Sequence, residues 1–112
     1  MLADTPPPPY TAVIFTSVRA PGDDDGYARM AEAMERLARA QPGFLGIESA
    51  RGPEPGEGIT VSYWAGEDEA RAWKEVAQHQ RAQALGRQRW YQAYRVRVAQ
   101  VSREYGPGPA AP

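Results

Sequence analysis

Residues 58–85, "GITVSYWAGEDEARAWKEVAQHQRAQAL", change from the two-residue period of a strand to the three- to four-residue period of a helix. Residues 58–65 alternate between two faces, as the side chains of a strand do. "GEDE", residues 66–69, then puts three acids near a helix start, where negative charge meets the positive end of the helix dipole. The helix extends to about residue 85. Its apolar side carries Ala70, Trp73, Ala77 and Ala84.

Four more elements are expected on either side of this stretch. "TAVIFTSVR", residues 11–19, is apolar on both faces, which is typical of a strand covered on both sides. Residues 27–40 carry an apolar stripe at helical spacing and end at "QPG". Residues 44–51 form a hairpin with residues 58–65 across a Gly- and Pro-rich connector. The last strand covers residues 94–105, and a change of apolar phase predicts a bulge near Ala99–Gln100.

The resulting order, βαββαβ, predicts an α+β fold of the ferredoxin-like kind. Right-handed crossovers turn this order into a four-stranded antiparallel sheet with two helices on one face. The other face has no helix to cover it, yet its strands are rich in apolar residues, and such a patch usually marks an interface. We therefore expect a homodimer that packs sheet against sheet. The folded domain covers residues 10–105, and residues 1–9 and 106–112 are expected to be disordered tails.

Composition excludes several classes of function. The formal net charge is −1, without the basic stripe that nucleic acids require, so we expect no nucleic-acid partner. There is no cysteine and one histidine, which makes a metal site improbable. No apolar run approaches the ~20 residues of a membrane span, and the N-terminus lacks the layout of a signal peptide. We expect a cytoplasmic protein with no membrane partner.

His79 is the candidate catalytic residue, because its unperturbed pKa is near neutrality. On a helical wheel it lies about 120° from Trp73, on the flank of the buried side. It either serves as a general base towards an aromatic substrate oxygen or makes an ordinary structural or surface contact, and the second is favoured because no orienting partner is evident.

A substrate pocket is expected between the sheet and the helices. The rings of Trp64 and Trp73 would line this pocket, although each is equally suited to filling the core. Phe15 and Ser17 would line the same space if their face of the first strand looks at the helices. Gln83 shares a stripe with His79 and completes this predicted pocket.

A dense cluster near the last strand predicts the dimer interface. Trp90, Tyr91 and Tyr94 combine aromatic bulk with polar tips, a composition enriched at interfaces. Val96 and Val98 continue the same side of the strand. Contact with a substrate is the alternative for this cluster.

"GITVSYW", the acid-led helix with a Trp and a His, and "HQRAQALGRQRWYQAYRVRVAQV" (residues 79–101) resemble the antibiotic biosynthesis monooxygenase (ABM) family, whose fold is a dimeric α/β barrel. The resemblance covers about residues 10–105. It implies a cofactor-independent monooxygenase: a quinol or polyketide-like aromatic loses a proton, and its anion donates an electron to molecular oxygen. A dimeric ligand-binding or accessory module on the same fold is the alternative, so whether the chain is an enzyme stays open.

Another branch of this superfamily binds and degrades haem, which implies haem as a possible cofactor. That branch uses an asparagine on the first strand, and this chain has no asparagine. Its helix histidine would fall near Gln83, so His79 comes too early. Haem is therefore disfavoured, and the expected cofactor set is none.

Overall fold

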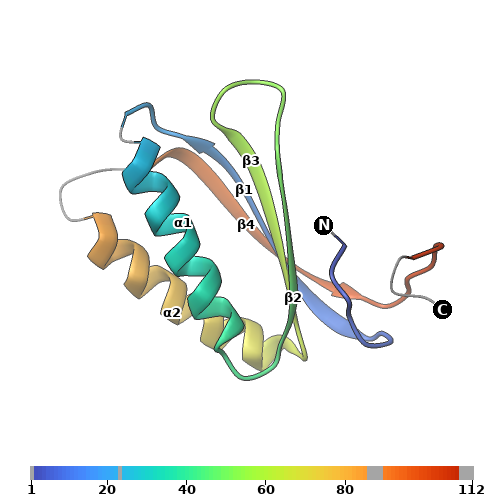
Figure 1. The fold of residues 1–112 in the computed structure, drawn as a ribbon. Helices are drawn as coiled ribbons and strands as arrows, with labels where there is room; N and C mark the ends of the chain where they lie inside the picture. Colours follow the sequence, from blue (N-terminus) through green and yellow to red (C-terminus); the bar gives the residue numbers. More distant parts are fainter. Residues whose placement is uncertain (1, 23, 86–89, 109–112) are drawn as a thin grey trace.

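The computed structural model describes residues 2–22, 24–85 and 90–108, with the backbone alone for residues 83–85. The elements alternate as predicted (Figure 1). Their bounds are β1 (Tyr10–Arg19), α1 (Asp24–Arg39), β2 (Phe44–Arg51), β3 (Glu57–Trp64), α2 (Glu67–Leu85) and β4 (Tyr91–Val101). The expected βαββαβ order is confirmed, and each predicted element except the last is placed to within three residues.

The four strands form one antiparallel sheet in the order β2-β3-β1-β4. The predicted bulge near Ala99–Gln100 is wrong, because both residues pair in register, with Ala12 and Thr11. The register shifts instead at Val18/Arg19, at the start of β4. β4 is exposed along most of its length, so the apolar pattern that suggested the bulge does not follow burial there.

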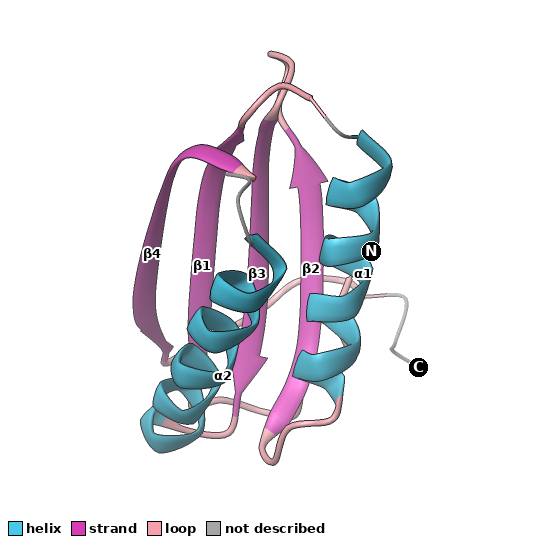
Figure 2. Cartoon of the chain, turned by 90° about the vertical axis from the view of Figure 1, so that its left-hand side faces the viewer, coloured by secondary structure: helices cyan, strands magenta, loops and turns pink. Residues whose placement is uncertain are grey.

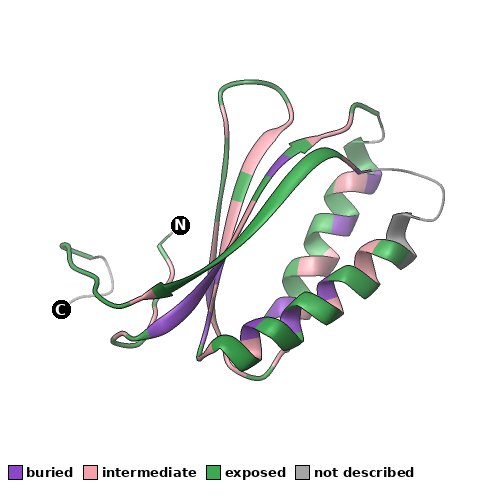
Figure 3. Cartoon of the chain, turned by 180° about the vertical axis from the view of Figure 1, so that it is seen from behind, coloured by how far each residue is buried: buried purple, intermediate pink, exposed green. Residues whose placement is uncertain are grey.

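Both helices lie on one face of the sheet, as expected (Figures 1 and 2). α1 packs beside β2, and α2 packs over β1 and β3. β4 is one of the two edge strands and stays mostly uncovered, which leaves it exposed in Figure 3. The helix layer is therefore narrower than the sheet.

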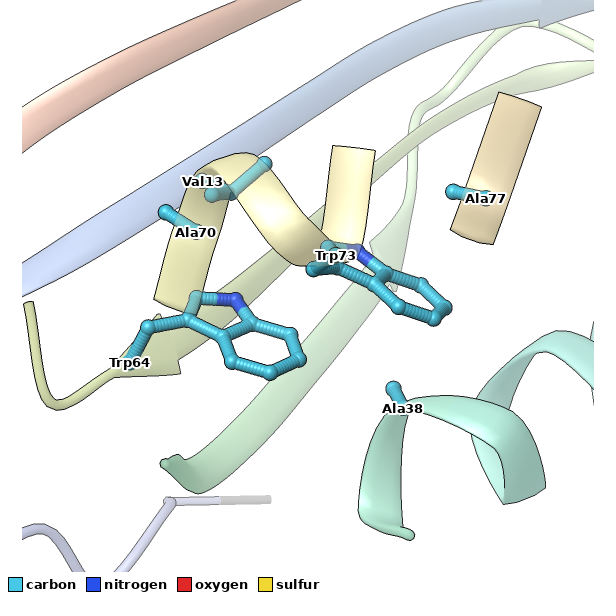
Figure 4. Close-up of a cluster of buried hydrophobic side chains, with 6 residues drawn as sticks. All are labelled: Val13, Ala38, Trp64, Ala70, Trp73 and Ala77. Carbon is cyan, nitrogen blue, oxygen red and sulfur yellow. The ribbon is translucent and has the colours of Figure 1, made fainter. Parts of the chain in front are cut away.

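The core forms where the two helices meet the ends of β1 and β3 (Figure 4). Trp64 is fully buried, and its ring stacks on that of Trp73 with 5.5 Å between ring centroids and an angle of 21°. Small side chains, Ala38 of α1 and Ala70 and Ala77 of α2, let the helices approach this tryptophan pair. The indole Nε1 of Trp64 donates to the hydroxyl of Ser62 at 2.9 Å, so the buried N–H is satisfied.

The other side of the sheet, the outer face, carries no helix. Register places Ile14 beside Val61, and the exposed fraction of Ile59 is 40%. The N-terminal segment crosses one end of this face: the backbone N–H of Ala3 donates to Glu48 at 2.9 Å, and the hydroxyl of Thr5 donates to that of Tyr10 at 3.1 Å. The disorder expected of residues 1–9 in solution stays a prediction. Within the described ranges, neither helix is long and apolar enough to cross a membrane.

We expect Ser62→Ala to lower the free energy of unfolding by about 1–3 kcal/mol, because it leaves the buried indole N–H of Trp64 without an acceptor. Ser49→Ala is the matched control, since Ser49 shares an exposed hydrogen bond of 3.1 Å with Thr60, and its cost is within about 0.5 kcal/mol. Urea unfolding followed by tryptophan fluorescence measures both. Equal losses for the two variants would contradict the role given to Ser62.

Candidate functional site

A cavity of about 870 Å³ lies between the sheet and the helices. Binding pockets for small organic molecules have volumes of roughly 300–1,000 Å³, so this space suits a ligand of several fused rings. Its sheet side includes Val13, Phe15 and Ser17 of β1, and its helix side includes Met34 of α1 and Trp73 of α2. Buried apolar side chains therefore close one end, and the cavity reaches exposed residues elsewhere along its rim.

Three rings pack against one another on the sheet side, and we call them the aromatic wall: Phe15, Tyr91 and Tyr94. Phe15 meets Tyr94 in a stacked contact, with 5.3 Å between centroids, and Tyr91 edge-on, with 5.2 Å. Tyr91 and Tyr94 are 5.9 Å apart. Ring faces and edges of this kind stabilise a second aromatic system placed against them.

Arg81 of α2 brings a positive charge to the aromatic wall. Its guanidinium carbon lies 5.3 Å from the ring centroid of Phe15 and 5.5 Å from that of Tyr94. Both distances are within cation–π range. Arg81 is partly buried and lines the cavity.

Tyr27 of α1 connects the helix layer to the start of β4. Its ring is 5.9 Å from that of Tyr91, and the Arg19 guanidinium lies 4.4 Å from the Tyr27 centroid. Arg19 also pairs with Asp24 in the first turn of α1. Burial, together with the nearby Tyr27 hydroxyl and its hydrogen bond, raises the pKa of Tyr91 well above 10, so Tyr91 stays neutral and can donate a hydrogen bond.

Acidic groups are confined to the rim of the cavity. Glu32, Glu35 and Glu67 line it on exposed side chains. Glu35 pairs with Arg39 at 3.1 Å, and Glu67 pairs with Arg71 at 3.9 Å. Across the described part of the chain, no group of three or more His, Cys, Asp or Glu residues is arranged to hold a metal ion.

Three of the five predicted pocket residues line the cavity: Phe15, Ser17 and Trp73. Trp64 does not; it lies beneath Trp73 as part of the core. The side chain of Gln83 lies outside the described residues. The structure thus places three of these residues at the cavity and Trp64 in the core, and their contact with a substrate stays a prediction.

His79 is exposed and is not among the described residues that line the cavity. The helical wheel placed His79 beside the buried side of α2. The buried side is narrower than expected, so His79 falls outside it. A general base must reach the proton that it removes. We therefore give His79 no part in the chemistry of the cavity.

The predicted interface residues divide into two groups. Trp90 is buried inside its own chain, and its ring is 6.3 Å from that of Tyr27. Tyr91, Tyr94, Val96 and Val98 line the cavity, so they lie on the helix-facing side of the sheet. A dimer that packs outer face against outer face would not bury these four side chains. Their position suits the alternative, contact with a ligand.

Sequence reasoning missed Tyr27 and Arg81 as site residues. Tyr27 is the first residue of the helix predicted over residues 27–40 and was treated as part of its apolar stripe, whereas its hydroxyl takes part in a hydrogen bond with Tyr91. Arg81 is two residues after His79, on a different side of α2. The signal that could have found Arg81 is an arginine four residues after Ala77, on the buried side of an amphipathic helix.

Comparison with known proteins identifies the family. The model of the family described as antibiotic biosynthesis monooxygenase, ABM, matches residues 9–85, so the chain belongs to that family. An uncharacterised protein of Bacillus subtilis strain 168, YqjZ, is 52% identical over 103 residues, covering 92% of this chain and 89% of its own length. Jasmonate monooxygenase ABM of Pyricularia oryzae is 30% identical over 92 residues, which is 81% of this chain and 43% of that protein.

The fold also matches solved structures. A single-residue variant of SnoaB, a cofactor-independent oxygenase from Streptomyces nogalater, superposes with a TM-score of 0.67 and covers 89% of this chain and 98% of its own. The two sequences are 14% identical, so this likeness establishes the fold alone.

We expect the protein to lose stability as the pH rises above about 10, the ordinary pKa of tyrosine. Burial raises the pKa of Tyr91 and of Tyr63, and the Glu48 carboxylate beside Tyr63 adds to the second shift. Above pH 10 the unfolded chain releases these protons and the folded chain retains them, so alkali favours unfolding. Urea midpoints between pH 8 and pH 11 measure the loss.

The double substitution Tyr63→Phe and Tyr91→Phe removes these two protons and should flatten the alkaline decline. Tyr105→Phe is the control, because Tyr105 is 90% exposed. An equal pH dependence in the double variant and the control would contradict this assignment.

Proposed function

We propose that this protein is a cofactor-independent monooxygenase of the ABM type, acting on a small hydrophobic aromatic molecule such as a quinol or polyketide. The observation that carries the proposal is the cavity of about 870 Å³, whose lining includes the aromatic wall and Trp73. A planar substrate would lie against the aromatic wall, with one edge open to solvent at the rim. Membership of a monooxygenase family supports the reaction class.

The proposed reaction uses oxygen as the only oxidant. A substrate with an acidic C–H or O–H loses a proton to solvent at the rim of the cavity, and the resulting anion donates one electron to O₂. The substrate radical and superoxide combine to a peroxide anion, which takes up one proton to give a hydroperoxide, and the hydroperoxide then loses water. A methylene group thereby becomes a carbonyl, with one O₂ consumed and one water released. The protein's contribution is to orient the substrate and to surround its anion with neutral hydroxyl donors and Arg81.

Haem does not suit this cavity. The only histidine in the sequence, His79, is exposed and lies outside the lining, so it would not reach a haem iron bound among the aromatic residues. The proposal therefore uses no haem.

The proposal is tested by following oxygen uptake and carbonyl formation with anthrone and with 1,8-dihydroxyanthrone, each of which carries the methylene group that the reaction converts. Ala31→Trp should lower turnover by about tenfold or more, because Ala31 lines the cavity and a large ring there displaces the substrate. Ala28→Trp is the matched control, since Ala28 is also an exposed residue of α1 but does not line the cavity. His79→Ala should retain turnover.

Oxygen uptake no faster than the uncatalysed rate, with both compounds still bound, would overturn the oxygenase proposal in favour of a ligand-binding module. Equal turnover in the two tryptophan variants would show that the cavity is not the site.

We also propose that a second copy of this chain covers the outer face. Ile14 and Val61 pair across the centre of this face, and Ile59 and Val18 are 40% and 36% exposed. No described element covers them, and apolar side chains grouped in this way favour burial against a similar surface. Identical outer faces satisfy the self-complementarity that a twofold dimer requires.

Val61→Lys should convert the dimer to monomer, raising its dissociation constant at least about tenfold, because the interface would bury a lysine charge and long side chain at its centre. Val98→Lys is the contrasting variant, since Val98 is 53% exposed on the helix-facing side. Sedimentation velocity over a range of concentrations measures both. A dimer broken by Val98→Lys and retained by Val61→Lys would place the interface on β4 instead.

A further inference from the structure

A guanidinium group lies inside the cavity with no carboxylate beside it. Within the described ranges, the ion pairs of this chain involve Arg19, Arg39 and Arg71, and none involves Arg81. Its neighbours are instead the ring faces of Phe15 and Tyr94. Guanidinium has five N–H donors and no acceptor, and stacking on a ring leaves its edge donors free.

The surroundings of Arg81 differ from those of the other cations at the cavity. Those cations are all exposed at the rim: Arg51, Arg71, Lys74 and Arg95. Arg71, for example, has a side chain that is 75% exposed and pairs with Glu67 and Asp68. Arg81 alone of these described cations is partly buried against the aromatic wall, where water screens its charge least.

The neutral groups around Arg81 do not cancel its charge. Burial and the neighbouring Tyr27 keep Tyr91 protonated, since the pKa of Tyr91 is raised. The carboxylates that line the cavity are exposed at the rim, and those of Glu35 and Glu67 have arginine partners of their own. The inner part of the cavity thus combines flat apolar surfaces, hydroxyl donors and one positive charge.

We propose that Arg81 makes the cavity selective for planar ring systems that carry an anionic oxygen, a carboxylate or an ionised enol, over neutral rings of the same shape. The inference rests on the proposed function, because it defines the substrate class of the same cavity. The free edge of the guanidinium would pair with the anionic oxygen, and the ring would lie against the aromatic wall. Charge-assisted hydrogen bonds of this kind are about twice as strong as neutral ones.

The role fits the chemistry of oxygen activation without a cofactor. An ionised ring donates an electron to O₂ more readily than its neutral form. A guanidinium that binds the anion increases the fraction of bound substrate in the reactive form. Arg81 is therefore a specificity-determining residue, and its effect is measurable in binding without turnover.

The test measures binding by calorimetry under anaerobic conditions with two matched pairs of ligands. The first pair is 1-naphthoate and 1-naphthamide, which differ in charge at nearly constant shape. The second is 2-hydroxy-1,4-naphthoquinone, an acidic enol that is ionised at neutral pH, and neutral 1,4-naphthoquinone. We expect the wild-type protein to bind each anion about tenfold or more tightly than its neutral partner.

Arg81→Gln should remove this preference and leave the affinity for the neutral members within about twofold. Arg81→Lys keeps the charge but loses the planar guanidinium that stacks on the rings, so it should retain part of the preference. Arg36→Gln is the control, because it removes one positive charge at an exposed position of α1 that is not among the residues lining the cavity, and the preference should remain. Circular dichroism and thermal unfolding check that each variant is folded.

Equal binding of anionic and neutral rings to the wild type, a preference that survives Arg81→Gln, or no binding of any of the four compounds would overturn this inference. A preference for only one pair would identify the bound anion as a carboxylate or as an enolate. Because no oxygen is present, the result is independent of whether the protein is an oxygenase, and failure of the turnover assay would leave it unchanged.

Discussion

The stacked contact between Trp64 and Trp73 is the interaction on which the site depends. It joins the end of β3 to α2, and small residues around it, Ala38, Ala70 and Ala77, let both helices come close to the sheet there (Figure 4). Beyond this point the residues of α2 that line the cavity include Gln78 and Arg81, which are long and polar. Tight packing at one end and long side chains farther along together leave a cavity instead of a continuous core.

The polar groups around the cavity are distributed unevenly between its rim and its interior. Carboxylates are exposed at the rim, and the interior holds rings, hydroxyls and one unpaired guanidinium among the described residues. Such an interior stabilises negative charge on an aromatic molecule without supplying a strong base. The proposed reaction, in which the substrate forms an anion and itself supplies the electrons, is consistent with this interior.

The sheet is wider than its helix layer, and this explains the exposed residues of β4. Tyr94, Val96 and Val98 face the helices' side beyond the edge of the helix layer, with Arg81 of α2 reaching over Tyr94, and they remain 50%, 38% and 53% exposed. An apolar strand seen in the sequence does not reveal which of its faces is left open. The interface prediction grouped these residues with Trp90 because both sets are aromatic or apolar, whereas the fold buries Trp90 and gives the other three to the cavity.

Local periodicity determined the type and bounds of the helices and strands. The strand and helix repeats and the acid-led start of α2 each depend on residues that are close together in the sequence. The order of the elements then allowed few topologies, which is why the antiparallel sheet and the single helix layer were predictable. The choice between Trp64 and Trp73 as cavity residue, the outward position of His79 and the approach of Arg81 to Phe15 were decided by the tertiary structure. Each depends on how far α2 stands from the sheet and how it is rotated about its axis, and contacts between residues distant in the sequence set both.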